Sequence, residues 1–146
     1  MRQTYVILCL MENIRYNKDT NELYIIDQTL LPNEEKEILL DTKEAMFDAI
    51  KLLKVRGAPA IGICAGYCMA ALAKQKIVNP DVCASSEITM LVDFYLRQLK
   101  GDADYLNSSR PTAVNLSWAL RRMMAKAQAL AEEALAPDNP PAVKDQ

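Results

Sequence analysis

Residues 55–62 read Val-Arg-Gly-Ala-Pro-Ala-Ile-Gly, in which an arginine and a glycine come directly before a proline and a run of small apolar residues. Proline favours the first position of a helix, so a helix is predicted to begin at Pro59. The first backbone N–H groups of this helix have no partner within it and would point back toward Gly57 and Ala58. Together with the positive end of the helix dipole and the Arg56 guanidinium, they form a natural site for an anion. A sugar phosphate is therefore the first ligand class to consider.

A simpler explanation of the same stretch stays open. Small residues recur through residues 58–73, and they let a buried helix approach its neighbours closely. In that case Gly57 only supplies a turn. Short glycine-containing motifs occur often by chance, so the residues alone do not decide between the two explanations.

The composition is that of one folded domain with no strong charge. The chain has 146 residues, with 17 basic and 19 acidic side chains, which gives a net charge of −2. A chain of this length buries about 68–70% of its unfolded surface, which is enough for a real core. The near balance of charge gives no electrostatic case for a nucleic acid partner or an anionic membrane. The expected partner is a small molecule held at a local anion site.

The reactive residues exclude several kinds of chemistry. The chain has no histidine, which excludes serine–histidine and cysteine–histidine nucleophile pairs and removes the commonest metal ligand. Its four cysteines, Cys9, Cys64, Cys68 and Cys83, lack the compact spacing of a zinc site. They are expected to be buried reduced thiols, and no metal is expected. Reduced thiols, with no convincing signal peptide or membrane-spanning stretch, favour a cytoplasmic protein.

Strands are expected in the first forty residues. Residues 13–17, 22–29 and 36–41 are rich in β-branched, aromatic and aliphatic side chains, and short polar or proline-containing turns separate them. Such short connections predict a three-stranded antiparallel meander. Four consecutive apolar residues at 23–26 suggest that the middle strand is covered on both faces.

Four helices are expected after the strands, which makes the fold class α+β. The first spans residues 42–54 and begins with a threonine that can cap it. The buried helix of residues 59–76 follows. A third helix is predicted over residues 85–101, with Gly101 as its stop, and a fourth over residues 112–135.

A second motif has the same arrangement as the first. Residues 109–116 read Ser-Arg-Pro-Thr-Ala-Val-Asn-Leu, so an arginine and a proline again stand at the start of a predicted helix. Arg110 could hold the same anion from another side. Taken by itself, Arg110 is more simply explained as a solvated loop residue, and Asn115 as a polar residue of the first helical turn.

Together the two motifs resemble those of the S-methyl-5-thioribose-1-phosphate isomerase family, whose fold is shared with regulatory subunits of a translation-initiation nucleotide exchange factor. The resemblance extends from residue 14 to about residue 135. It rests on Leu-Tyr-Ile-Ile-Asp-Gln at residues 23–28, on the stretch at 55–62, and on Arg-Pro-Thr-Ala-Val-Asn-Leu at 110–116 followed by Trp118.

The resemblance implies a division of the chain into three parts. Residues 11–136 correspond to the N-terminal domain of the family. Residues 1–10 are expected to be an upstream extension, and residues 137–146, which contain three prolines, a disordered tail. The family's Rossmann-like second domain carries a catalytic cysteine, a catalytic aspartate and an Asn-Lys pair, and it is expected to be absent from this chain.

By the same resemblance, the family's reaction is an aldose-to-ketose isomerisation in methionine salvage, on a pentose with phosphate on its C1 hydroxyl. No cofactor is implied. The family's Arg-Gly-Ala segment maps onto Arg56, Gly57 and Ala58, and the arginine of its Arg-Pro-Thr motif maps onto Arg110. These four are the expected substrate-binding residues. No catalytic residue is expected, so the chain by itself is expected to be inactive, and the full-length family is expected to form homodimers.

Other functions stay open at this point. One is a non-catalytic regulatory or interaction module like the translation-factor relatives. Others are a ribose-1,5-bisphosphate isomerase and a purely structural helical bundle. The sequence Asn-Leu-Ser-Trp at residues 115–118 favours the thioribose-phosphate isomerase over the first two. The structural bundle predicts that Arg56→Ala changes nothing in ligand binding.

Overall fold

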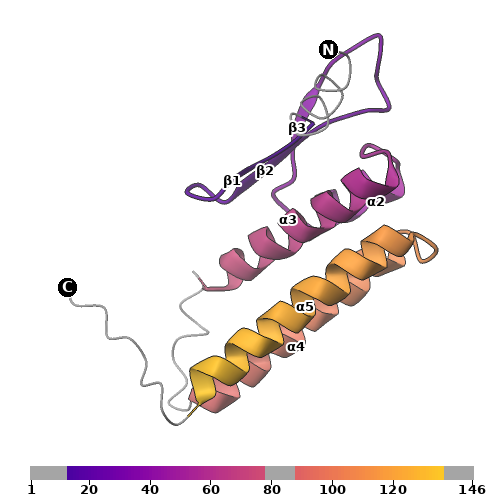
Figure 1. Cartoon of the computed structure of the whole chain (residues 1–146). Helices are drawn as coiled ribbons and strands as arrows, with labels where there is room; N and C mark the ends of the chain where they lie inside the picture. Colours follow the sequence, from indigo (N-terminus) through magenta and orange to yellow (C-terminus); the bar gives the residue numbers. More distant parts are fainter. Residues whose placement is uncertain (1–12, 78–87, 137–146) are drawn as a thin grey trace, which may run out of the picture.

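The fold has three layers, which Figure 1 shows nearly edge-on. The computed structural model describes residues 13–77 and 88–136. A small sheet lies on one side of the long helix α3 (Ala58–Ile77), and helices α4 (Ile88–Ser108) and α5 (Val114–Leu135) lie on the other side. The prediction of an α+β fold, with a three-stranded meander followed by four helices, is confirmed.

The sheet is a simple antiparallel meander with the order β1-β2-β3. Ile14 lies opposite Ile25 in the first pair of strands, and Tyr24 lies opposite Leu39 in the second. The strands are shorter than predicted, because pairing stops where the chain turns. Their bounds are β1 Ile14–Asn17, β2 Glu22–Ile26 and β3 Glu37–Leu39.

The prediction that β2 is covered on both faces is wrong. Leu23 and Ile25 are buried, whereas Tyr24 and Ile26 between them are only half-buried. Helix α3 contacts β1 and β2 and covers one face of the sheet only. On the other face, the exposed guanidinium of Arg15 lies 4.6 Å from the centroid of the Tyr24 ring. A strand with one open face alternates between buried and accessible side chains.

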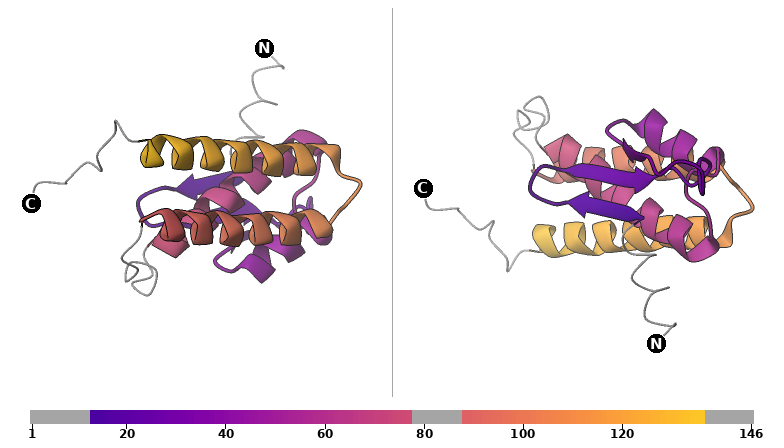
Figure 2. Two further views of the ribbon diagram at one scale, coloured as in Figure 1. Left: turned by 90° about the horizontal axis from the view of Figure 1, so that it is seen from below. Right: turned by 90° about the horizontal axis from the view of Figure 1, so that it is seen from above.

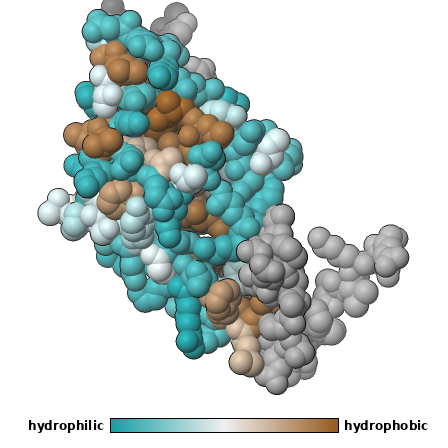
Figure 3. Space-filling view, turned by 180° about the vertical axis from the view of Figure 1, so that it is seen from behind, coloured by the Kyte–Doolittle hydropathy of each residue, from teal (hydrophilic) through white to brown (hydrophobic). Residues whose placement is uncertain are grey.

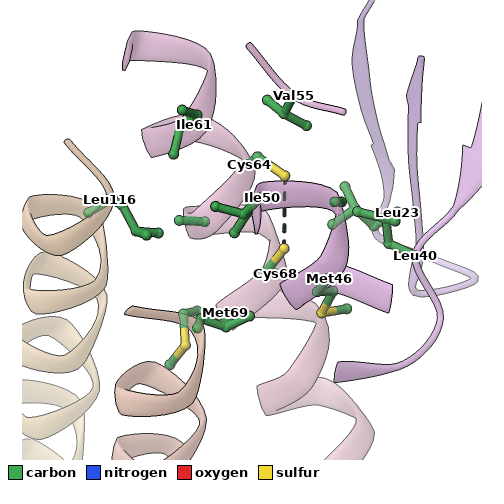
Figure 4. Packing of buried hydrophobic residues seen from close by; sticks show 14 of the residues in the cluster. Leu23, Leu40, Met46, Ile50, Val55, Ile61, Cys64, Cys68, Met69 and Leu116 are labelled. Carbon is green, nitrogen blue, oxygen red and sulfur yellow. Dashed lines mark hydrogen bonds between the residues drawn. The ribbon is translucent and has the colours of Figure 1, made fainter. Parts of the chain in front are cut away.

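Helix α3 is central, which explains why its sequence is small and apolar on most sides. It contacts the sheet, α4 and α5, and the short helix α2 (Lys43–Lys51). A helix with neighbours on most sides has no wide polar face. Figure 4 shows side chains of the sheet, α2, α3 and α5 meeting in one core. The largest of the fully buried side chains are Leu23, Ile25, Met46, Ile50, Leu106 and Leu116.

Helix α2 begins where the sequence predicts and ends earlier. Thr42 caps it, because the Thr42 hydroxyl accepts a hydrogen bond of 3.1 Å from the N–H of Ala45. The helix ends at Lys51 rather than near residue 54, and Leu53 adopts a left-handed backbone with φ 58°. This reversal turns the chain toward the start of α3.

The prediction that Gly101 stops the third helix is wrong. Helix α4 runs through Gly101 to Ser108, and it lies antiparallel beside α5 (Figure 2). The extra turns bury Ala103 and Leu106 in the core. A glycine inside a helix costs about 1 kcal/mol, which this burial outweighs. The predicted start of this helix at residues 85–87, the extension at 1–10 and the tail at 137–146 lie outside the described residues.

The described cysteines are buried thiols, as predicted. Cys64 and Cys68 are free, and their sulfur atoms lie 3.9 Å apart on α3 (dashed line in Figure 4). Hydrogen bonding to Cys64, together with burial, raises the pKa of the Cys68 thiol, so this thiol is a poor nucleophile. Cys9 and Cys83 lie outside the described residues. Within residues 13–77 and 88–136, no group of three or more acidic or cysteine side chains could hold a metal ion. No helix in the same ranges is long and apolar enough to cross a bilayer.

Candidate anion-binding site

The first wall of the candidate site is the start of α3. The carbonyl of Gly57 accepts the first helical hydrogen bond, 3.0 Å from the N–H of Ile61, so the helix begins at Ala58, one residue earlier than predicted. Pro59 therefore takes the second helical position. Gly57 has φ 90°, a conformation that residues with a side chain rarely adopt. The first turn carries no acidic residue, so the positive end of its dipole is not neutralised by the helix itself.

Arg56 is held in place by the loop that follows β2. Its backbone N–H donates to the side-chain carbonyl of Gln28 at 3.0 Å, and the backbone N–H of Gln28 donates to the carbonyl of Lys54, also at 3.0 Å. The Nε of Arg56 donates to the carbonyl of Leu53 at 3.4 Å. No local pattern indicates this role of Gln28, because the two hydrogen bonds join residues 26 and 28 positions apart.

The second wall is the start of α5. The N–H of Ala113 donates to the carbonyl of Arg110 at 2.9 Å, and this turn moves the helix start to Val114, two residues later than predicted. Ala113 occupies the N-cap position and offers no side-chain acceptor. The N–H groups of Val114, Asn115 and Leu116 therefore have no partner within α5.

Helices α3 and α5 run in the same direction and lie close together at their beginnings (Figure 1). A Cβ added at Gly62 would lie 3.3 Å from the backbone carbonyl oxygen of Asn115, so a larger residue would push the helices apart. Because the two helices are parallel and in contact here, the positive ends of both dipoles lie at the same end of the molecule.

A cavity of about 460 Å³ lies where the two helix starts meet. The four predicted substrate-binding residues, Arg56, Gly57, Ala58 and Arg110, all line it. Thr112 and Asn115 also line it. Asn115 was noted in the sequence only as a polar residue of a first turn. The remaining described residues around the cavity are Leu53, Ile61, Ala113, Val114 and Leu116.

The electrostatics of the cavity suit an anion. Two arginines and the first turns of two helices line it, and none of its described lining residues is acidic. Within residues 13–77 and 88–136, no carboxylate lies within 4 Å of the guanidinium of Arg56 or Arg110. Neither charge is thus neutralised internally, and both can pair with a bound phosphate.

The cavity offers binding groups and little acid–base chemistry. Its described lining residues include no carboxylic acid, cysteine or lysine, and the chain has no histidine. Cys64 is completely buried in the core, away from the cavity lining. The arrangement can hold and orient an anionic ligand.

The geometry is that of an α+β domain in which two parallel helices begin at one cavity. The chain belongs to the Initiation factor 2 subunit family, whose pattern matches residues 54–139. It resembles the 5-deoxyribose 1-phosphate isomerase of Petrotoga mobilis, with 46% identity over 111 residues, which are 75% of this chain and 28% of that protein. It also resembles the methylthioribose-1-phosphate isomerase of Bacillus licheniformis, with 46% identity over 104 residues, 71% of this chain and 26% of that protein.

Solved structures show the same relationship. The 5-methylthioribose 1-phosphate isomerase of Pyrococcus horikoshii superposes with a TM-score of 0.67 at 30% identity, over 88% of this chain and 31% of that chain. The delta subunit of translation initiation factor eIF-2B from A. fulgidus superposes with a TM-score of 0.58 at 31% identity, over 83% of this chain and 34% of that chain. The chain therefore corresponds to less than a third of the length of its curated relatives, which are sugar-phosphate isomerases.

Proposed function

We propose that this chain supplies the phosphate-binding part of an isomerase that converts a pentose 1-phosphate from aldose to ketose. The observation that carries the proposal is the meeting of Arg56, Arg110 and two helix N-termini around one cavity. A phosphate ester with two negative charges matches two guanidinium groups and free backbone N–H groups. The likeness to isomerases of two pentose 1-phosphates supports the same ligand class.

The substrate we propose is 5-methylthioribose 1-phosphate, converted to 5-methylthioribulose 1-phosphate in methionine salvage, in the cytoplasm. The sugar of the Petrotoga relative, 5-deoxyribose 1-phosphate, has the same phosphate and also lacks a hydroxyl at C5. Both candidate substrates therefore share a charged end for the cavity and an apolar end opposite to it.

In this proposal the chain binds the substrate and does not transform it. Opening the sugar ring and moving hydrogen between C1 and C2 requires an acid and a base, and each such group contributes roughly 10²- to 10⁴-fold to the rate. The described lining of the cavity offers neither. The acid and the base would come from the part of the relatives that lies beyond this chain.

Replacing either arginine tests the proposal. Arg56→Ala and Arg110→Ala should each weaken the binding of inorganic phosphate and of 5-methylthioribose 1-phosphate, because each removes a charge-assisted hydrogen bond worth about 1.5–3 kcal/mol. This corresponds to roughly a 10- to 150-fold rise in Kd, measured by isothermal titration calorimetry.

Arg97→Ala is the matched control, because Arg97 is an exposed arginine on α4 that pairs with Asp93 and lies away from the cavity. It should leave both affinities unchanged. Equal affinities in all three variants would contradict the proposal and indicate that the two motifs have a purely structural role. Phosphate binding without any preference for the sugar phosphate would favour a general anion-binding module instead.

A further inference from the structure

A second hollow lies beside the anion cavity, along the outer side of α3 and α5. We call it the α3–α5 groove. Its volume is about 580 Å³. It meets the anion cavity at Val114 and Asn115, which line both. Ile63, Gly66, Trp118, Arg121 and Arg122 are among the other residues that line it.

Large apolar side chains are left accessible in the groove. Ile63 and Trp118 are each 52% exposed, although both belong to helices with extensive buried faces. Hydrophobic side chains also form patches among hydrophilic ones on the face seen in Figure 3. Single exposed apolar residues are common, but an apolar hollow with an aromatic wall is typical of a ligand site.

Gly66 is the residue that keeps the groove open. A Cβ added at Gly66 would meet no atom within 4 Å, and the residue has an ordinary helical backbone, so neither packing nor conformation requires a glycine. Glycine inside a helix nevertheless costs about 1 kcal/mol relative to alanine. Gly62, one turn earlier, differs in this respect, because it permits the contact with Asn115.

The spacing between cavity and groove fits one sugar phosphate. The two hollows adjoin along the first turns of α3, where Ala58 and Ile61 line the cavity and Pro59, Gly62 and Ile63 line the groove. Residues 58–63 span about 7.5 Å along the helix axis at 1.5 Å per residue. In a pentose 1-phosphate, five bonds separate phosphorus from C5 by way of the ring oxygen, which span on the order of 6–7 Å. A ligand whose phosphate occupies the cavity can thus place its C5 substituent in the groove.

We infer that the α3–α5 groove binds the apolar C5 substituent of the sugar phosphate, with Trp118 and Ile63 as its walls. This inference rests on the proposed function. A methylthio group gains from contact with the indole ring, because sulfur packs favourably against aromatic rings. A C5 hydroxyl gains no such packing against the indole ring. The groove therefore selects for sugars without a C5 hydroxyl.

A ligand series separates this selection from phosphate binding. The full 146-residue chain is titrated with inorganic phosphate, ribose 1-phosphate, 5-deoxyribose 1-phosphate and 5-methylthioribose 1-phosphate. Affinity should rise in that order for the three sugars, by about fourfold for each buried methyl or methylene group. Trp118 is the only tryptophan of the chain, so its fluorescence reports on the groove alone. Its emission should move to shorter wavelength with the methylthio sugar and stay in place with inorganic phosphate.

Ribose 1,5-bisphosphate is the rival ligand, because Arg121 and Arg122 also line the groove and could attract a second phosphate. The guanidinium of Arg122 already lies 5.2 Å from the centroid of the Trp118 ring. Tightest binding of the bisphosphate would overturn the inference, and so would equal affinity for all three monophosphate sugars.

Gly66→Leu fills the groove with a side chain that the backbone accepts. It should abolish the preference for 5-methylthioribose 1-phosphate over ribose 1-phosphate, whereas inorganic phosphate, which has nothing to place in the groove, binds as before. Gly101→Leu is the matched control, since Gly101 is another glycine inside a helix with open space around it and lies on α4. A preference that survives Gly66→Leu contradicts the inference.

The two proposals can fail separately. Loss of binding for inorganic phosphate and every sugar phosphate contradicts the proposed function. The groove is then tested with ethyl methyl sulfide, which carries the thioether without phosphate or sugar. A shift of Trp118 emission with this probe, absent in Gly66→Leu, supports an apolar thioether site. The absence of any shift overturns it.

Discussion

Single residues give the site its local shape. Gly57 allows the chain to enter α3 with φ 90°, and Pro59 follows inside the first turn without needing a hydrogen-bond acceptor. Gln28 fixes the backbone of Arg56 through its side-chain carbonyl. Arg56 thus lines the cavity, and its guanidinium has no carboxylate partner among the described residues.

Gly57→Ala should destabilise the protein by about 1–3 kcal/mol, because a side chain at φ 90° is strained. The free energy of unfolding can be measured by urea denaturation followed by circular dichroism. Gly101→Ala is the matched control and should act in the opposite direction, stabilising α4 by up to about 1 kcal/mol. Equal effects of the two substitutions would show that the backbone at Gly57 is not constrained.

At the scale of elements, the loop after β2 links the sheet to the site. The carboxylate of Asp27 accepts hydrogen bonds from the N–H of Thr29 at 3.0 Å and from its hydroxyl at 2.6 Å. The ammonium of Lys54 lies 3.9 Å from the same carboxylate. These contacts hold the loop against the segment that leads to Arg56, so they couple the position of the sheet to that of the cavity wall.

The Asp27 carboxylate in this loop should make the free energy of unfolding depend on pH in the acidic range. Burial by itself would raise the pKa of Asp27, but the two hydrogen bonds from Thr29 and the charge of Lys54 outweigh it and lower the pKa. A lowered pKa in the folded state adds stability above the unfolded value of about 3.9, and this stability is lost as the pH falls through the folded value.

Urea denaturation between about pH 5 and pH 2 should therefore show a steeper loss of stability in the wild type than in Asp27→Asn. Asp93→Asn, which alters an exposed ion pair on α4, should keep the wild-type slope. If the stability of Asp27→Asn fell with pH as steeply as that of the wild type, this role of the carboxylate would be contradicted.

The elements also show what local sequence could predict. Helix α2 and its threonine cap were predicted correctly, because capping depends on residues within one turn. Gly101 was a misleading stop signal, because a helix continues through glycine when its later turns bury apolar surface. The apolar run in β2 was likewise misleading, since the number of covered faces depends on where α3 packs.

At the scale of the whole molecule, one buried carboxylate joins three helices. Asp102 on α4 lies 3.5 Å from the ammonium of Lys43 on α2 and 2.9 Å from that of Lys76 on α3. The Asp102 side chain is only 5% exposed, whereas both lysines reach solvent in part. The cluster ties the start of α2 and the last turn of α3 to α4.

Asp102→Asn should lower the free energy of unfolding by about 1–3 kcal/mol. The loss stays below that of a fully buried pair, because both lysines can turn to water once the carboxylate is gone. Asp104→Asn on the same helix is the control. It breaks only an exposed pair with Lys100 and should cost less than about 1 kcal/mol. If urea denaturation showed similar losses of unfolding free energy in Asp102→Asn and Asp104→Asn, the stabilising role of the cluster would be contradicted.

Local sequence is enough to predict that two helices begin next to an arginine, because the signals are a glycine or proline and its immediate neighbours. It also pointed to the four residues of the candidate site and to the family. The packing of distant segments brings Arg56 and Arg110, 54 positions apart, to the lining of one cavity and places Gln28 against the backbone of Arg56. That outcome depends on α3 and α5 running parallel and touching at Gly62, and a contact between distant segments leaves no local mark in the chain.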